Sequence, residues 1–399
     1  MSIRIIIEII DLLLWIIIAG NVFYVLFFAL ASLLPKKKKT LPSSIIHQPS
    51  FLVLFPAYHE DAVIIHSIES FLHQDYPKEL FHVAVISDNM SDETNQHLAS
   101  LPITLLCPNF EKSSKAKALQ HAISSISQHT SSAYDYVVVL DADNIVAPDF
   151  LTQLSKIAHP SMAIQCHRTA KNADNDIAAL DGLSEEINNS IFRKGHNRIG
   201  MSSALIGSGM CFDYHWFCAN VSKLDSAVED RELEALLMMQ GVHIHYAEDI
   251  LVMDEKVSSS DNFQRQRLRW MTGQVQAFLQ MLPSLPKAII TGNINYIDKT
   301  IQQALIPRSI LLVLTPILCI IATLTSSIYH LPSTIFHLKW WFTLALFIIG
   351  LYIAIPSQLR KSTIFRKVLS FPILIWKMLH NIIHINPKNK EFIHTSHRQ

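Results

Sequence analysis

Residues 136–143 read YVVVLDAD, an unbroken apolar run that ends in two aspartates, Asp141 and Asp143. Apolar runs of this length, bounded by polar residues, are typical of strands buried on both faces of a parallel sheet. Two carboxylates at i and i+2 of an extended chain point to the same side, where they can hold a divalent cation and a diphosphate. Taken alone, the pair could instead be an N-cap and a turn residue before Pro148.

Three similar apolar runs precede this one, and the segments between them have the length and periodicity of helices. Because strands alternate with helices, the order predicts an α/β domain with a mostly parallel, nucleotide-binding sheet. Ligands of such sheets bind beyond the carboxyl ends of the strands, which is where the polar residues collect here. The runs are 51–55, 83–86 and 103–106, and the first two end in the polar segments 56–61 and 87–92.

The segment 12–34 carries no charged residue, and as a helix it would be roughly 35 Å long, enough to cross a bilayer. Pro35 ends it and four lysines follow at 36–39. The positive-inside rule therefore places the N-terminus outside and the chain after Lys36 in the cytosol. A cleaved signal peptide is the alternative, since 29–31 resembles a cleavage site, but the length of the run and the place of the lysines favour a membrane anchor.

Two more apolar runs, 309–328 and 340–355, follow the sheet-forming part of the chain. Residues 329–337 between them carry no Lys or Arg, whereas basic residues follow the second run. This asymmetry predicts a membrane hairpin with an external loop, and two buried helices of a soluble domain are the alternative. The segments 282–305 and 369–385 mix apolar and charged residues, so we expect them to lie at the membrane surface.

The overall composition excludes several classes of function. Half of the 399 residues are hydrophobic, and 33 basic residues balance 33 acidic ones, so nothing indicates a nucleic-acid partner. The five cysteines form no CxxC pair, which suits a reducing cytosol better than a disulfide framework. There are only ten glycines and no glycine-rich phosphate loop.

A series of short motifs, in order over about 220 residues, carries a resemblance to a known family. Together they resemble the family 2 glycosyltransferases of the GT-A fold. The greatest similarity is to their membrane-embedded group, which includes cellulose, chitin and hyaluronan synthases and ceramide glucosyltransferase. Ser87, His59 and Ser114 depart from the family pattern, where Asp, Asn and Gly are usual. The segments are 55–60 (FPAYHE), 85–94 (VISDNMSDET), Lys115 with 118–119, the DxD motif 141–143, 228–230 (VED) and the QxxRW motif 266–270.

The resemblance implies an inverting transfer in which Asp230 is the catalytic base and Glu229 holds the sugar donor or positions Asp230. A charged helix N-terminus is the simpler interpretation of this acidic pair. It also implies Mg²⁺ or Mn²⁺ as cofactor. The implied contacts are Ala57, Tyr58, Glu60, Asp88, Lys115, Asp141 and Arg269 for the nucleotide sugar, Gln266, Arg267, Trp270 and Gly209 for the acceptor, and Asp143 with Asp141 for the metal.

The sequence thus predicts an integral membrane enzyme that moves a sugar from a nucleotide sugar, expected to be UDP-linked, to a polysaccharide. A single transfer to a lipid acceptor is the alternative within this class. A sugar-nucleotidyltransferase is a second alternative, but such enzymes begin with a glycine-rich loop that carries an Arg, which 56–59 lacks. An inactive membrane scaffold is a third, but it would not need the acidic residues. The expected parts are an N-terminal membrane helix and basic linker (1–44), a cytosolic GT-A domain (45–275), an interfacial segment (276–305), a membrane hairpin (306–357) and a cytosolic tail (358–399).

Overall fold

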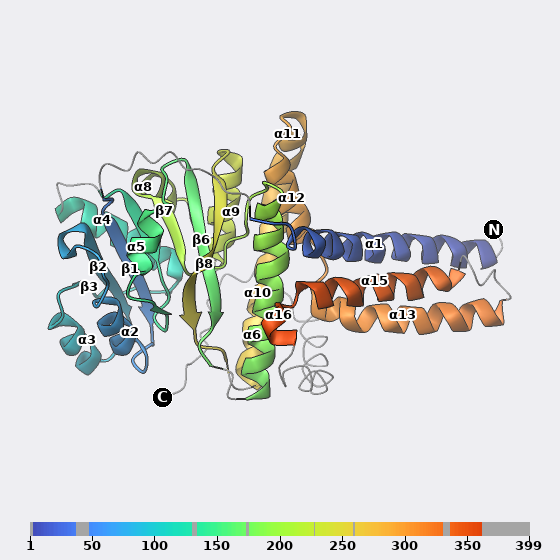
Figure 1. Ribbon diagram of the computed structural model, residues 1–399, viewed down its shortest axis with the longest axis horizontal. Coiled ribbons are helices and arrows are strands. Elements are labelled where there is room, and N and C mark those ends of the chain that lie inside the picture. Colours follow the sequence, from blue (N-terminus) through green and yellow to red (C-terminus); the bar gives the residue numbers. More distant parts are fainter. Residues whose placement is uncertain are drawn as a thin grey trace.

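The computed structural model describes residues 3–36, 48–129, 134–172, 175–226, 228–257, 260–329 and 336–360. Lysines 37–39 and the predicted surface segment 369–385 lie outside the described residues. The described chain forms a globular part built around a sheet and a bundle of helices that extends from one side of it (Figure 1).

An eight-stranded mixed sheet forms the centre of the globular part (Figure 1). From one edge to the other its strands are β3 (Thr104–Leu106), β2 (Phe81–Asp88), β1 (Phe51–Tyr58), β4 (Tyr136–Val139), β7 (Met210–Asp213), β6 (Met162–Ala170), β8 (His243–Asp254) and β5 (Ile145–Val146). The first four are parallel to one another, as the sequence pattern predicts. Strand β7 is antiparallel to both of its neighbours, which makes the sheet mixed.

The first strand explains why these runs are apolar without interruption. Its residues alternate between two cores, with Phe51, Val53 and Phe55 on one face of the sheet and Leu52 and Leu54 on the other, and all five are fully buried. Because helices cover both faces, neither set of side chains meets water. Helices α2 (Ile64–Phe71) and α5 (Phe150–Ser155) supply the first cover, and α4 (Lys115–His129), α8 (Tyr214–Val221) and α9 (Glu229–Met239) supply the second.

A layer of helices lies between the sheet and the bundle (Figure 1). It consists of α6 (Asp176–Asn188), the π-helical η2 (Asn189–Gly195), α7 (His196–Arg198), α10 (Ser260–Met281), η3 (Leu282–Ser284), α11 (Leu285–Ile290) and α12 (Ile294–Ala304). Helix α10 is continuous through the predicted domain boundary at 275. Helix α3 (Asp92–Ala99) lies at the side of the sheet away from the bundle (Figure 1), and the short η1 (Lys78–Leu80) directly precedes β2.

Helix α12 differs from the expectation that all of 282–305 lies at a membrane surface. Asp298 and Lys299 are both buried, and Lys299 has no exposed surface. Asp298 accepts a hydrogen bond from Tyr24, and its Oδ2 lies 3.1 Å from His196 Nε2 and 3.8 Å from the amino group of Lys299. These two charged residues of α12 therefore face inward, where Tyr24 and His196 come from distant parts of the chain, whereas Lys287 of α11 is exposed.

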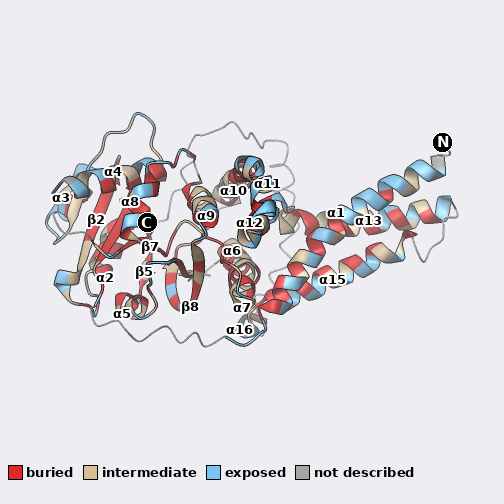
Figure 2. Cartoon of the chain, turned by 90° about the horizontal axis from the view of Figure 1, so that it is seen from above, coloured by how far each residue is buried: buried red, intermediate tan, exposed pale blue. Residues whose placement is uncertain are grey.

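Three helices, α1 (Ile3–Ala31), α13 (Arg308–Ile328) and α15 (Leu338–Ala354), form the bundle, and the short α16 (Ser357–Arg360) follows at its base. Among the described helices, α1 and α13 are long and apolar enough to cross a membrane, whereas α15 is shorter. Figure 2 shows exposed residues along the outer sides of this bundle. Helix α1 begins before the predicted residue 12 because Asp11 is buried against Lys339 and Trp340 of α15.

Candidate active site

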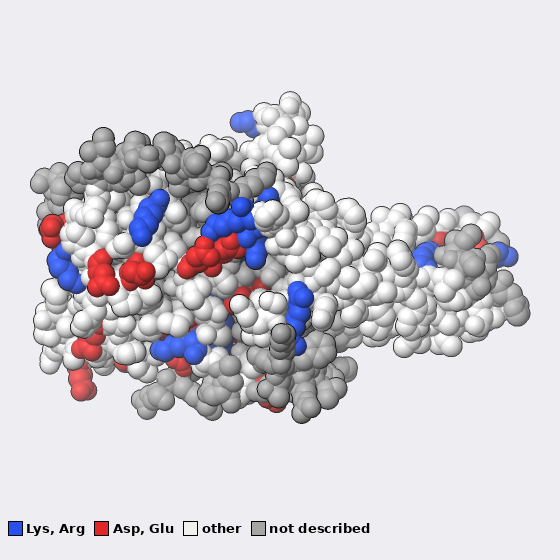
Figure 3. All heavy atoms as spheres, viewed as in Figure 1, with Lys and Arg blue, Asp and Glu red and all other residues white. Residues whose placement is uncertain are grey.

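A cavity of about 450 Å³ lies beyond the carboxyl ends of β1, β2 and β4. Its walls come from the strand ends, from the loop before β7, from α9 and α10, and from α6 and the bases of α1 and α13. One continuous space therefore joins the carboxyl ends of the strands to the helix bundle. Figure 3 shows acidic and basic side chains close together on one face of the globular part.

One end of the cavity is built on the ends of β1 and β2, where Tyr58 is paired with Asp88. Asp88 is 3% exposed, and burial raises the pKa of its carboxyl group. His59 and Asn89, which follow the two strands, both have positive φ angles of 54° and 56°. Asn adopts this conformation readily, which gives a backbone reason for the family's Asn at the position of His59. Ala57, Tyr58 and Glu60 line the same end.

Lys115, the first residue of α4, lies among the acidic groups of the cavity. Its amino group binds Asp141, donates to the carbonyl oxygen of Gly207 at 2.7 Å, and lies 3.5 Å from Glu229 Oε1. Burial alone would lower the pKa of Lys115, but Asp141 and Glu229 more than offset this and raise it. The lysine is thus held as a cation, and in this state it neutralises carboxylates of the site.

Asp143 lies beside this group and is 5% exposed. Its Oδ2 accepts the backbone N–H of Glu255 at 2.7 Å, and its Oδ1 accepts the side-chain amide of Asn144 at 3.1 Å. Among the described residues, no group of three or more His, Cys, Asp or Glu side chains is arranged so that it could hold a metal ion by itself. Magnesium, however, is usually held by one or two carboxylates together with substrate phosphates, and Asp143 with Asp141 fits that arrangement.

The acidic pair Glu229–Asp230 begins helix α9. Glu229 is buried, and burial raises the pKa of its carboxyl group to about 7, with Lys115 lowering it and Asp230 raising it further. Asp230 is half-buried at the cavity wall, and its Oδ1 accepts the backbone N–H of Arg231 at 2.9 Å. Helix geometry thus fixes one oxygen of Asp230 and leaves the other for a ligand.

Two nearby glycines have different roles, and the structure corrects the expectation for one of them. Gly207, with φ of 75°, lines the cavity, and a Cβ there would lie 3.7 Å from Glu229 Oε1 and 3.9 Å from Asp230 Oδ2. Gly209 is packed within the sheet, where a Cβ would lie 2.9 Å from Val252. Gly207, rather than the predicted Gly209, is therefore the glycine that lines the cavity.

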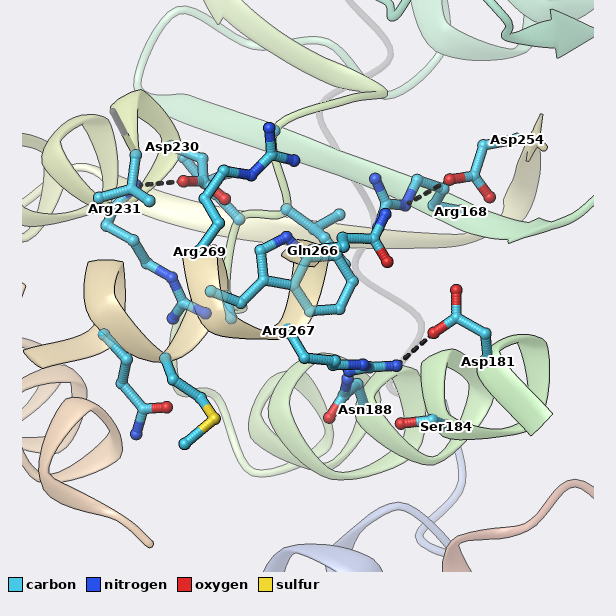
Figure 4. Close-up of a pocket in the computed structure, with 18 of the residues that line it drawn as sticks. Arg168, Asp181, Ser184, Asn188, Asp230, Arg231, Asp254, Gln266, Arg267 and Arg269 are labelled. Atoms are coloured by element: carbon cyan, nitrogen blue, oxygen red, sulfur yellow. Dashed lines mark hydrogen bonds and ion pairs between the residues drawn. The ribbon is translucent and has the colours of Figure 1, made fainter. Parts of the chain in front are cut away.

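Helix α10 brings Gln266, Arg267, Arg269 and Trp270 to the cavity (Figure 4). Arg267 pairs with Asp181 of α6, and its guanidinium lies 4.5 Å from the ring centre of Trp270. Gln266 Oε1 is buried and has no hydrogen-bond partner among the described residues. Burial lowers the pKa of Arg269, and the charges of the acidic residues around it oppose that effect.

The sequence analysis missed one charged group of the cavity wall. Arg168 of β6 pairs with Glu185 at 3.1 Å and with Asp254 at 3.6 Å, and Lys256 pairs with Asp254 at 2.7 Å. Asp254 ends a mostly apolar strand, as the DxD motif does, and this pattern is the sequence signal that could have identified the group. The pairing of β6 with β8 brings these residues together, and it could not be foreseen from local periodicity.

We expect the activity of the protein to fall as the pH drops through about 7, because Glu229 then becomes protonated and loses its ion pair with Lys115. The carboxyl group has a raised pKa, so its charged form is present only above about 7. Measuring kcat/KM between pH 5.5 and 8.5 tests this, since that ratio reports groups of the free enzyme. The acidic limb should disappear in Glu229→Gln, and an unchanged limb in that variant would assign the titration to another group.

The chain is similar to known proteins by three comparisons. Residues 48–273 match the family described as glycosyltransferase like family 2. The chain is 24% identical over 282 residues to an N-acetylglucosaminyltransferase of Rhizobium leguminosarum bv. viciae, covering 66% of this chain and 64% of that protein. It is also 24% identical over 279 residues to an N-acetylglucosaminyltransferase of Sinorhizobium fredii (strain NBRC 101917 / NGR234), covering 66% of each. The chain thus spans just under two thirds of the length of these relatives.

Among solved structures, the chain is similar to the mannosyltransferase PcManGT from Pyrobaculum calidifontis in complex with GDP-Man and Mn²⁺. The TM-score is 0.55 at 16% sequence identity, and the match covers 87% of this chain and 97% of that one. At this level of identity the similarity concerns the fold alone.

Proposed function

The chain belongs to the glycosyltransferase like family 2 and has the GT-A fold, and from this membership we propose that it is an inverting, nucleotide-sugar-dependent enzyme at the cytosolic face of a membrane. The observation that carries the proposal is the convergence of two pairs of acidic residues with one lysine and one arginine in a single cavity. These residues are Asp141, Asp143, Glu229, Asp230, Lys115 and Arg269.

In the proposed reaction a hydroxyl oxygen of the acceptor attacks the anomeric carbon of the bound sugar. The hydroxyl proton passes to the free oxygen of Asp230, and the bond from the anomeric carbon to the diphosphate oxygen breaks, so that the nucleoside diphosphate leaves with the electron pair. Lys115 and Arg269 are the cations that would face the leaving diphosphate. Asp143, with Asp141, would hold Mg²⁺ or Mn²⁺, which when bound neutralises charge on the diphosphate.

The names of the relatives suggest which sugar to test first. Both curated relatives are named N-acetylglucosaminyltransferase, so UDP-N-acetylglucosamine is the first nucleotide sugar for an assay. A polysaccharide, as the sequence analysis predicts, and a lipid-linked molecule are the two acceptors that the proposal considers.

The proposed membrane location is supported by the surface of the bundle. Side chains such as Phe23 on α1 and Leu324 on α13 are 68% and 58% exposed, and on the face drawn in Figure 3 the middle of the bundle carries no charged side chain. Such a surface would be poorly stable in water and is suited to lipid. The N-terminus lies at the end of the bundle away from the sheet, so one side of the membrane would hold the cavity and the other the N-terminus (Figure 1).

This topology predicts which cysteines an impermeant maleimide reaches in intact cells. Cys107 is exposed on the globular part, and Ser327 is exposed near the far end of α13. In a background without other cysteines, we expect Ser327→Cys to be labelled and Cys107 to be labelled only after the cells are permeabilised. Labelling of Cys107 in intact cells would contradict the cytosolic location of the cavity.

The activity itself is tested with the purified full chain in lipid nanodiscs, supplied with a panel of UDP- and GDP-linked sugars and Mn²⁺. We expect release of nucleoside diphosphate from one member of the panel, which increases when membrane lipids or short oligosaccharides are added as acceptors. The variant Asp230→Asn in the same nanodiscs is the matched control for contaminating hydrolases. If no nucleotide sugar yields nucleoside diphosphate above that control, the proposed function is wrong.

A further inference from the structure

The two ends of the cavity differ in charge. The end on the sheet carries Glu60, Asp88, Asp141, Asp143, Glu229 and Asp230 together with two cations, Lys115 and Arg269. The lining also includes Arg168, Arg231 and Lys256 with Asp254 and Glu255. The end next to the bundle carries three arginines and one aspartate, namely Arg193, Arg267, Arg308 and Asp181. A nucleotide sugar with a metal ion would fit the acidic end, whereas the basic end indicates a second, anionic ligand.

Arg308 is the arginine of this end whose charge is not compensated. Arg267 pairs with Asp181, and Arg193 pairs with Glu185 at 3.2 Å. Arg308 donates only to neutral groups, the carbonyl oxygen of Ser184 at 3.2 Å and Asn188 Oδ1 at 2.6 Å, and no carboxylate pairs with it among the described residues.

The helix that anchors Arg308 also faces Arg267 of α10. Asp181, Ser184 and Asn188 recur at helical spacing on one side of α6, and Figure 4 shows them facing Arg267 across the cavity. Both bonds of Arg308 to α6 use the same nitrogen, Nη2. Since a guanidinium carries five N–H groups, donors remain for a phosphate or carboxylate, to which arginine binds strongly.

The walls around Arg308 are apolar and belong to the base of the bundle. The side chains that line this end come from α1, α6, η2 and the start of α13, and they are Val25, Leu183, Ile187, Phe192, Ile306 and Leu312. An occupant that satisfies both features needs a negative charge and a hydrocarbon part. A neutral oligosaccharide would meet neither of them.

The bundle itself favours an occupant that is already in the bilayer. Its helices are in direct contact, since a Cβ on Gly350 of α15 would lie 3.2 Å from the Cα of Leu26 of α1. Trp15 of α1 also donates a hydrogen bond to Thr343 of α15 at 3.0 Å. Among the described helices, α1 and α15 are therefore packed too closely for a polysaccharide chain to pass between them, whereas a lipid would approach the cavity from the bilayer.

We propose that the bundle end of the cavity binds a lipid through the phosphate of its head group, held by Arg308, and that this lipid carries the acceptor. The first hydrocarbon groups of the lipid would lie against the apolar walls, and the rest would remain in the bilayer. The acceptor role rests on the proposed function, whereas binding of the lipid phosphate does not.

The test uses the full chain in phosphatidylcholine nanodiscs and a radiolabelled isoprenyl monophosphate as probe. We expect saturable binding, at least about tenfold weaker for the corresponding isoprenyl alcohol, because the alcohol cannot form the charge-assisted hydrogen bonds to Arg308. Arg308→Gln should weaken binding of the phosphate by a similar factor, leave binding of the alcohol unchanged, and be partly rescued by Arg308→Lys. If excess phosphatidylglycerol displaced the probe, the natural occupant would be a bilayer phospholipid. If the probe stayed bound, the natural occupant would be an isoprenyl carrier.

Arg360 provides the matched control, because it also lies at the base of the bundle and is outside the cavity lining, and its hydrogen bonds within the described part of the chain go to the backbone carbonyls of Ile353 and Ile355. We expect Arg360→Gln to bind the probe within about twofold of the parent. Equal losses in both variants, or equal affinity of the parent for the phosphate and the alcohol, would overturn the proposal. Binding of UDP shows whether Arg308→Gln is folded. If this variant is not folded, the proposal is tested by probe binding to Arg308→Lys and by the affinities of the parent for the isoprenyl phosphate and the isoprenyl alcohol. Because probe binding needs no turnover, its outcome is independent of whether the enzyme assay succeeds.

Discussion

Replacing Asp230 with Asn is expected to lower kcat by about a hundredfold to ten-thousandfold, the usual contribution of a general base. The amide cannot take the proton of the acceptor hydroxyl. Its oxygen can still accept the backbone N–H of Arg231, as Asp230 Oδ1 does, so the start of α9 should keep its structure. Binding of UDP is therefore expected to remain close to that of the parent.

The measurement is turnover of the nucleotide sugar found in the panel, together with calorimetric titration of UDP. Glu232→Gln is the control, because Glu232 lies on the same helix outside the cavity lining, where it accepts the backbone N–H groups of Asp225 and Ser226. Glutamine can accept the same bonds, so this variant should keep most of its activity. If Asp230→Asn turned over within threefold of the parent, Asp230 would not be the base.

Replacing Asp143 with Ala is expected to abolish measurable turnover and to remove the dependence on metal. Asp143 is the more buried carboxylate of the DxD motif, and its backbone and amide contacts hold it at the cavity wall. Without the Asp143 carboxylate the metal would be held less well, and the negative charge of the leaving diphosphate would be less neutralised. This would raise the activation free energy by several kcal/mol. Activity of the parent should disappear in excess chelator and return with Mg²⁺ or Mn²⁺.

Asp149→Ala controls for a general effect of losing an aspartate in this region. Asp149 lies shortly after the motif but is exposed, and its carboxylate accepts a hydrogen bond from Gln153. We expect this variant to bind Mn²⁺ and to turn over like the parent. Full turnover of the parent in excess chelator would show that the reaction needs no divalent cation.

The sequence alone determined the parallel half of the sheet and the segments that contribute to the cavity. The run 136–140 could be assigned to a buried strand because both of its faces are apolar, and that is a property of the local sequence. The polar residues after β1, β2 and β4 then had to meet at one edge, because parallel strands end on the same side. The predicted contacts that follow β1, β2 and β4 are in the cavity lining for this reason, whereas those on α4, α9 and α10 reach it through the packing of these helices.

Only the tertiary structure decided which of these groups pair and what lies opposite them. Lys115 meets Glu229 from a distant part of the chain, and the antiparallel strand β7 brings Gly207 to both. Charged residues of α12 that look like a membrane-surface pattern are buried because their partners lie on α1 and α7. Arg308 marks only the start of an apolar helix in the sequence, and its place in the cavity depends on the packing of α13 against α6. Periodicity reports which face of an element is buried, but the partner of a charged group is fixed by contacts between segments far apart in the chain.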